Sequence, residues 1–166
     1  LYSSAASDVY KRQELNGLTI NSVTSNDFRL QNVFVKQELD RSFEPELVLY
    51  CVKGYSNLEA IKIIEPAVGN KTHILTLQNG LGSGDALEDA FNGASILLGA
   101  TYIDASVEAP GVINEYGGSC SIVFGPKIEN QDNSVIEINE TMVNAGINSQ
   151  ISADIMSTVW SKLVLI

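Results

Sequence analysis

The stretch that decides the fold is residues 46–91, "ELVLYCVKGYSNLEAIKIIEPAVGNKTHILTLQNGLGSGDALEDAF". Residues 47–52 are apolar at nearly every position, which is typical of a strand covered by helices on both faces. Residues 72–77, "THILTL", predict the next strand. Because a helical pattern separates the two strands, we expect them to be parallel neighbours.

That helical pattern follows the first strand directly. Ser56 and Glu59 have the spacing of a capping box, and the apolar repeat after them predicts a helix over about 56–68 that stops at Gly69. After the second strand, a glycine-rich turn leads into a second predicted helix near 82–92. This alternation of strands and helices predicts an α/β fold with a parallel, doubly wound sheet.

The flanking segments differ in texture. Residues 95–125 contain β-rich runs with no room for a crossover helix, so hairpins or a meander are expected. Helical spacing returns near 131–145, and after a short strand a last helix is predicted from about 153 to the end. Near the start, residues 15–22 and 28–36 predict short strands beside the parallel core.

The first thirteen residues, "LYSSAASDVYKRQ", show neither helical nor strand periodicity. The run "DVYKRQ" resembles a translated sequencing-library adapter. We therefore treat residues 1–13 as a non-native segment, with an ordinary disordered tail as the alternative, and exclude them from the fold prediction.

Composition limits the classes of function. The 166 residues carry a net charge of −10 with scattered acids, which argues against a nucleic-acid or anionic-membrane surface. No stretch is long and apolar enough for a membrane helix, so a cytoplasmic protein is expected. Cys51 and Cys120 match no metal-binding or redox spacing and are predicted to be reduced, buried thiols, and we expect no metal site.

Four stretches occur in a fixed order: "LYCVKGY", "LTLQNGLG", "LGATYIDASVEAPGVINEYGG" and "VWSKLVL". Together they resemble the ketopantoate reductase (2-dehydropantoate 2-reductase) family. The resemblance implies a Rossmann-like domain for NADP(H), an all-α C-terminal domain, and reduction of a 2-keto acid, 2-dehydropantoate to pantoate, in pantothenate biosynthesis. It also implies a small-molecule keto acid as partner and allows a homodimer.

The chain contains no Gly-x-Gly-x-x-Gly motif. The nearest imitation, "GLGSGD", has no glycine placed for close helix–strand packing, and Asp85 after it would repel a pyrophosphate. Compared with the family, residues 14–146 are predicted to be the Rossmann-like domain without its first βαβ unit. Residues 147–166 are predicted to be the last strand and the start of the C-terminal helix. We therefore expect a central fragment, truncated at both ends and inactive by itself.

The resemblance also implies roles for individual residues. Lys53, Asn79 and Ala105 would contact the cofactor, and Asn79 and Lys162 would contact the substrate. Lys162, in the Trp-x-Lys-Leu motif, would be the catalytic general acid. Ile166 stands where the family pattern has an asparagine, so substrate contacts from this helix beyond Lys162 are not carried over.

Each assignment has a structural alternative. Lys53 is also explained as a solvated strand-end lysine, Asn79 as part of an Asn-Gly turn in the left-handed conformation, and Lys162 as a surface lysine. Trp160 is predicted to pack in the core. For the whole protein, the alternatives are another NAD(P)-dependent β-hydroxyacid-type dehydrogenase, or a non-catalytic binding module that retains the fold.

Overall fold

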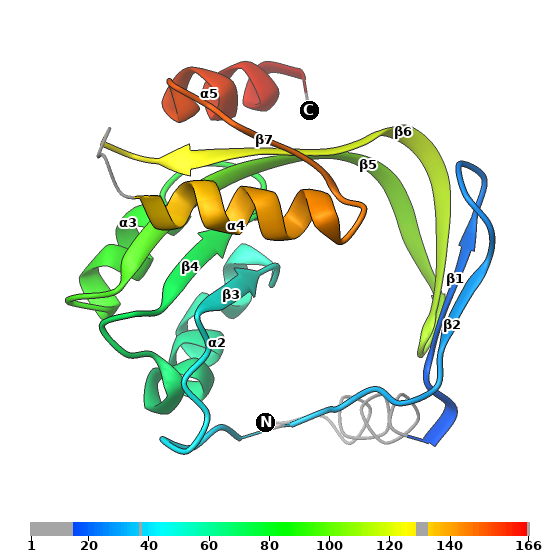
Figure 1. Ribbon diagram of the computed structural model, residues 1–166, viewed down its shortest axis with the longest axis horizontal. Coiled ribbons are helices and arrows are strands. Elements are labelled where there is room, and N and C mark those ends of the chain that lie inside the picture. Colours follow the sequence, from blue (N-terminus) through cyan, green and yellow to red (C-terminus); the bar gives the residue numbers. More distant parts are fainter. Residues whose placement is uncertain (1–14, 37, 129–132, 166) are drawn as a thin grey trace. The chain divides into compact units, whose positions relative to one another are not determined.

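The computed structural model describes residues 15–36, 38–128 and 133–165 (Figure 1), so the predictions for residues 1–13 and for Ile166 lie outside the described residues. By compactness the chain divides into two units. The larger unit comprises Glu38–Thr101 and Ser121–Ile166, and the smaller comprises Leu1–Gln37 and Tyr102–Cys120. The predicted boundary between residues 146 and 147 stays a prediction.

The larger unit is built on parallel strands. Strand β3 (Leu47–Tyr50) pairs in parallel with β4 (His73–Thr76), with Leu47 opposite His73 and Tyr50 opposite Thr76. Strand β4 pairs in parallel with the first residues of β5 (Ser95–Ala109). The end of β6 (Val112–Pro126) pairs in parallel with β7 (Asn148–Ile151), so the order in this unit is β7-β6-β5-β4-β3. The predicted parallel pairing is confirmed.

Helices cover both faces of these strands. Side chains alternate along β4, so Ile74 and Leu75 point to opposite faces, and both are fully buried. Ile74 packs in a cluster with residues of α2 (Asn57–Ile64) and α3 (Ser83–Ala90). Leu75 packs in a second cluster with α4 (Asn133–Asn144). The predicted α/β, doubly wound architecture is therefore correct for this unit.

Helix α5 (Ile155–Leu165) follows β7 and has a well-formed start. The backbone N–H of Ser157 donates to Asp154 Oδ1 at 3.0 Å, and this bond caps the helix. The bonds from the Ser157 hydroxyl and backbone lower the pKa of Asp154. Ile155, at the first position of α5, is buried close to Gly125 of β6.

Several local predictions were wrong. Helix α2 ends at Ile64 and gives way to a 3₁₀ turn, Glu65–Ala67, because Pro66 has no N–H with which to continue the helix. The expected capping box is absent at Ser56, whose side chain makes no capping bond. The first strand is not fully covered either: Leu49 is 46% exposed, since β3 is the last strand in the described order.

The smaller unit contains β1 (Leu18–Ser22), β2 (Phe28–Leu30) and the outer parts of the β5–β6 hairpin. Strands β1 and β2 are antiparallel, and β1 is parallel to β6, with Thr19 opposite Val112. The hairpin was predicted, and β1, predicted as a short strand beside the parallel strands, does pair in parallel with β6. Its partner is the outer part of β6, a long-range pairing that the local sequence does not specify.

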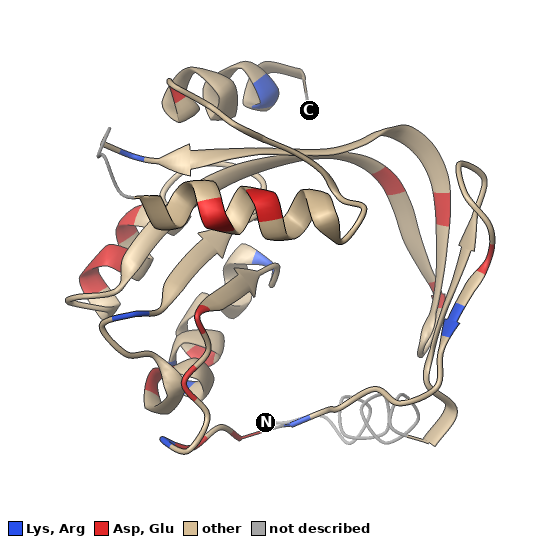
Figure 2. Ribbon diagram, viewed as in Figure 1, with Lys and Arg blue, Asp and Glu red and all other residues tan. Residues whose placement is uncertain are grey.

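Acidic residues are spread over α2, α3, α4 and the β5–β6 hairpin (Figure 2), consistent with the net charge of −10. In the described ranges, no helix has the length and apolar character needed to cross a bilayer.

The prediction of buried thiols was wrong: Cys51 is exposed and Cys120 is half-buried. Cys51 lies directly after the last residue of β3.

Candidate functional site

The loops that follow β3 and β4 carry two of the predicted site residues. Lys53 and Asn79 each stand three positions beyond the register pair Tyr50 and Thr76. Because parallel strands end at the same edge of a sheet, both residues lie at the edge where α/β proteins bind ligands. Lys53 is exposed, so its ammonium is not buried at a strand end, and its carbonyl accepts the Ser56 N–H at 2.8 Å.

The structure brings Asn79 and Lys162 together although they are 83 positions apart in the sequence. Lys162 Nζ on α5 donates to Asn79 Oδ1 at 2.7 Å. Lys162 is half-buried, and burial lowers the pKa of its ammonium below the ordinary 10.5. The left-handed conformation of the Asn-Gly turn is supplied by Gly80, with φ 96°, and not by Asn79. The Asn79 side chain therefore faces α5 from a turn that Gly80 makes.

Gln78 was missed by the sequence analysis. Its Nε2 donates to the carbonyl of Val52 and to Oδ1 of Asn57, each at 2.6 Å. These bonds connect the loop after β4 to the loop after β3 and to the start of α2. The signal available in the sequence was a long polar side chain placed directly after an apolar strand and directly before Asn79.

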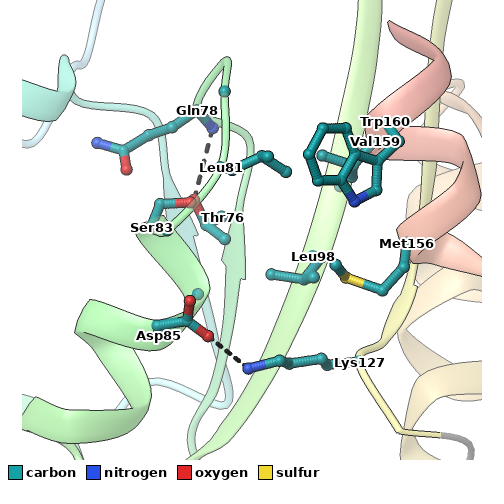
Figure 3. A pocket seen from close by; sticks show the side chains of 14 residues that line it. Thr76, Gln78, Leu81, Ser83, Asp85, Leu98, Lys127, Met156, Val159 and Trp160 are labelled. Atoms are coloured by element: carbon teal, nitrogen blue, oxygen red, sulfur yellow. Dashed lines mark hydrogen bonds and ion pairs between the residues drawn. The ribbon is translucent and has the colours of Figure 1, made fainter. Parts of the chain in front are cut away.

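A cavity of about 230 Å³ lies between the β4–α3 loop and α5 (Figure 3). Leu81 points across it toward Val159 and Trp160 of α5. Trp160 is 52% exposed, so its prediction as a core residue was wrong. The full lining is Thr76, Gln78, Gly80, Leu81, Gly82, Ser83, Gly84, Asp85, Leu98, Gly99, Lys127, Met156, Val159 and Trp160.

The glycine-rich start of α3 packs more closely than expected. Gly84 is buried, and a Cβ placed there would lie 2.5 Å from Leu98 Cδ2, so this glycine does allow close helix–strand packing. Asp85 and Glu88 of α3 both pair with Lys127, and these bonds raise the pKa of the lysine. The first turn of α3 therefore presents a carboxylate rather than an anion site, as the sequence predicted.

Two other predicted site residues are not brought to the Asn79–Lys162 pair by any contact. The Lys53 ammonium makes no hydrogen bond or ion pair with another described residue. Ala105 is exposed in the part of β5 that belongs to the smaller unit. Their roles toward a cofactor stay predictions.

A second polar cluster lies in the smaller unit. Glu115 is 6% exposed as a residue, and its carboxylate accepts hydrogen bonds from Ser22 Oγ, from Thr24 Oγ1 at 2.8 Å and from Cys120 Sγ at 3.6 Å. The Ser22 bond is the main cause of a pKa lowered to about 2, with the Thr24 bonds next. Within the described ranges, no three His, Cys, Asp or Glu side chains are grouped to hold a metal ion.

The chain is similar in sequence to one family of known proteins. The family model described as "Ketopantoate reductase PanE/ApbA" matches residues 5–128. A curated 2-dehydropantoate 2-reductase from Pyrococcus abyssi is 31% identical over 122 residues, which are 74% of this chain and 39% of that protein.

Solved structures agree with the fold. The crystal structure of 2-dehydropantoate 2-reductase from Geobacter metallireducens has a TM-score of 0.84 at 30% identity, covering 94% of this chain and 51% of the other. The ternary structure of D-mandelate dehydrogenase with NADH and anilino(oxo)acetate has a TM-score of 0.83 at 20% identity, covering 94% of this chain and 50% of that one, and shows a shared fold. The chain thus spans about half the length, or less, of the relatives it matches.

Proposed function

Because the chain belongs to the ketopantoate reductase family, we propose that it is the central part of an NADPH-dependent reductase that converts 2-dehydropantoate to pantoate. The observation that carries the proposal is the 2.7 Å hydrogen bond between Lys162 and Asn79 at the ligand-binding edge of the sheet. The proposal includes a phosphate-binding βαβ unit before this segment and an all-α domain after it. This segment alone is then inactive.

The described residues suit one end of a nicotinamide cofactor. Lys53 and Asn79 extend from neighbouring strand ends, and they would hold the nicotinamide–ribose end with a cation and a carboxamide. The start of α3 does not suit the pyrophosphate, because Asp85 occupies its first turn. When bound, the cofactor supplies the hydride. NADP rather than NAD rests on the family resemblance.

Lys162 is the proposed proton donor. Reduction of a ketone needs a proton at the carbonyl oxygen, and a general acid is most effective when its pKa lies near the working pH. Burial moves the pKa of Lys162 in that direction. Asn79 Oδ1 accepts one ammonium N–H and so fixes the direction of the others. The positive charge of Lys162 also favours an anionic keto acid and stabilises the alkoxide as it forms.

A second candidate is another NAD(P)-dependent dehydrogenase of the β-hydroxyacid type. The cavity between the β4–α3 loop and α5 favours it, because Leu81, Val159 and Trp160 would accept a bulkier apolar side chain than that of 2-dehydropantoate. The place in pantothenate biosynthesis and a possible homodimer are proposed from the family resemblance, and the cytoplasmic location is proposed from the sequence.

The test is the rate of NADPH oxidation by the longer protein that contains this segment. We expect turnover with 2-dehydropantoate and slower turnover with 2-ketoisovalerate and phenylglyoxylate. NADH in place of NADPH should be a poorer reductant. Faster turnover with phenylglyoxylate would favour the second candidate, and no turnover with any keto acid would refute both.

A further inference from the structure

We propose that Gln78 is a positioning residue for this reaction: its carboxamide locks the loop after β3 to the loop after β4 and so keeps Asn79 in place against Lys162. This inference rests on the proposed function for its role in catalysis. Its structural part, the dependence of the Asn79–Lys162 contact on Gln78, stands on the hydrogen bonds themselves.

The carboxamide orientation of Gln78 is determined by its two partners. Val52 O and Asn57 Oδ1 are both acceptors, and both lie 2.6 Å from Nε2. An amide nitrogen carries two N–H donors and satisfies both acceptors, whereas the flipped amide would place an oxygen against two oxygens. The side chain therefore has one arrangement here and joins both partners at once.

The two partners lie on either side of a predicted site residue. Val52 immediately precedes Lys53, and Asn57 begins α2 after the short 3₁₀ turn. Tyr50, which is 3% exposed, places its hydroxyl 3.3 Å from the Asn57 carbonyl and supports the same segment. The two hydrogen bonds of Gln78 therefore hold residues 52 and 57, which lie on either side of Lys53.

In the loop after β4, Gln78 immediately precedes Asn79. The backbone link between the strand ends is the bond from Leu77 N–H to the Tyr50 carbonyl, at 3.0 Å. Beyond that point the chains diverge into loops, and the Gln78 side chain continues the connection. Because this link lies directly before Asn79, we expect the contact between Asn79 and Lys162 to depend on it.

The remaining polar atom of Gln78 argues against a purely stabilising role for this side chain. Its Oε1 is buried and has no hydrogen-bond partner among the described residues. A buried acceptor without a partner costs stability, and an apolar side chain of similar length would avoid that cost. The two short bonds of Nε2 are retained despite it, which fits a residue that serves the alignment of the loops.

The structural part is tested on the 166-residue chain. Nuclear Overhauser contacts between the Asn79 carboxamide protons and the Lys162 methylene protons report the pair directly. Gln78→Met keeps the length and removes the donors, and should abolish these contacts. Gln150→Met, the same change at an exposed position of β7, should leave them intact. Unchanged contacts in Gln78→Met would overturn the inference, whatever the activity of the longer protein.

The catalytic part is tested on the longer protein. Gln78→Met should lower kcat roughly 10- to 100-fold, because a small misplacement of a catalytic group has an effect of that size. Gln78→Glu should lower it further, since a carboxylate repels both acceptors. A residue with a merely structural role would lower the thermal midpoint and the folded fraction but leave kcat per folded molecule unchanged, and that result would contradict the proposal.

A double-mutant cycle keeps the proposal falsifiable if Gln78→Met folds poorly. Asn57→Ala removes one of the two acceptors and should reproduce part of the loss in kcat. If the two residues act through one bridge, the double variant should lose much less than the product of the single losses. Fully independent effects would contradict the bridge.

Discussion

Two polar clusters of this chain, one in each compact unit, are built in opposite ways. In the smaller unit Glu115 is a buried residue, and Ser22, Thr24 and Cys120 donate to its carboxylate oxygens. In the larger unit Asn79 is exposed, and its carboxamide accepts from the half-buried Lys162 at the edge of the sheet.

The difference separates a structural cluster from a candidate site. A carboxylate that accepts several hydrogen bonds inside the protein stabilises its own strands and has little capacity left for a ligand. A lysine whose pKa is lowered by burial, beside an exposed amide at a strand end, retains chemistry for a substrate. The sequence shows a charged residue in both places, and only the surroundings distinguish their roles.

The largest expected effect is that of Lys162→Met. It should lower kcat for keto-acid reduction by roughly 10²- to 10⁴-fold, as expected for loss of a general acid. The KM for NADPH should change little, because the cofactor is held elsewhere. Steady-state kinetics of the longer protein measure both values. Lys62→Met on the exposed side of α2 is the matched control, and an equal loss there would remove the distinction between the two lysines.

Changes at Asn79 should move the pH dependence in opposite directions. A hydrogen bond to the ammonium favours the charged form, so Asn79→Ala should lower the pKa of Lys162 further. Since the donor must be protonated, the alkaline fall of kcat then moves to lower pH. Asn79→Asp adds a negative charge beside Lys162 and should move that fall to higher pH. The pH profiles of kcat test this, with a loss of about 10-fold expected at the optimum for Asn79→Ala. If the pH profiles of kcat of the wild type and both Asn79 variants coincide, Lys162 is not the group whose titration causes the alkaline fall.

Glu115→Gln should affect stability and not chemistry. The pKa of Glu115 is about 2 in the folded chain, below the ordinary 4.5, so the ionised carboxylate stabilises the fold. This stabilisation is fully present above about pH 4.5 and is lost as the pH falls through the folded pKa of about 2. The variant should unfold more easily at neutral pH and lose this pH dependence. Denaturant titrations over the acidic range measure it. A large fall in kcat per folded molecule would place Glu115 in the active site instead.

The smallest effect is expected for Lys127→Met. Lys127 pairs with Asp85 and Glu88 on the surface of α3, and exposed ion pairs contribute little because water and salt screen them. The thermal midpoint should fall slightly, and the difference from the wild type should vanish at high salt. A large, salt-independent loss would show that Lys127 supports the cavity by packing.

The parts of the fold that depend on local pattern were predictable from the sequence. The apolar runs and the helical pattern between them predicted the parallel pairing of β3 and β4, and the family resemblance predicted that Asn79 and Lys162 contact one substrate, which agrees with their hydrogen bond. Long-range pairing was not predictable in the same way. The position of β1 depends on the outer part of β6, which lies far along the chain.

The contact between Asn79 and Lys162 joins two residues that the sequence had singled out, whereas Gln78 was missed. Gln78 acts through the geometry of two loops, and no spacing rule identifies an amide that lies between two carbonyl groups. Trp160 was assigned to the core because large aromatic residues are commonly buried, whereas the described helix α5 turns it toward the cavity. Ala105 and Lys53 were assigned by resemblance, and their roles remain to be tested.

The most direct test of the account is a structure of the longer protein with NADPH and an unreactive 2-keto acid analogue. The keto oxygen should lie within hydrogen-bond reach of Lys162 Nζ, about 2.6–3.2 Å, with Asn79 beside the nicotinamide ribose. An analogue bound elsewhere, with Lys162 still hydrogen-bonded to Asn79 and remote from the keto oxygen, would contradict it.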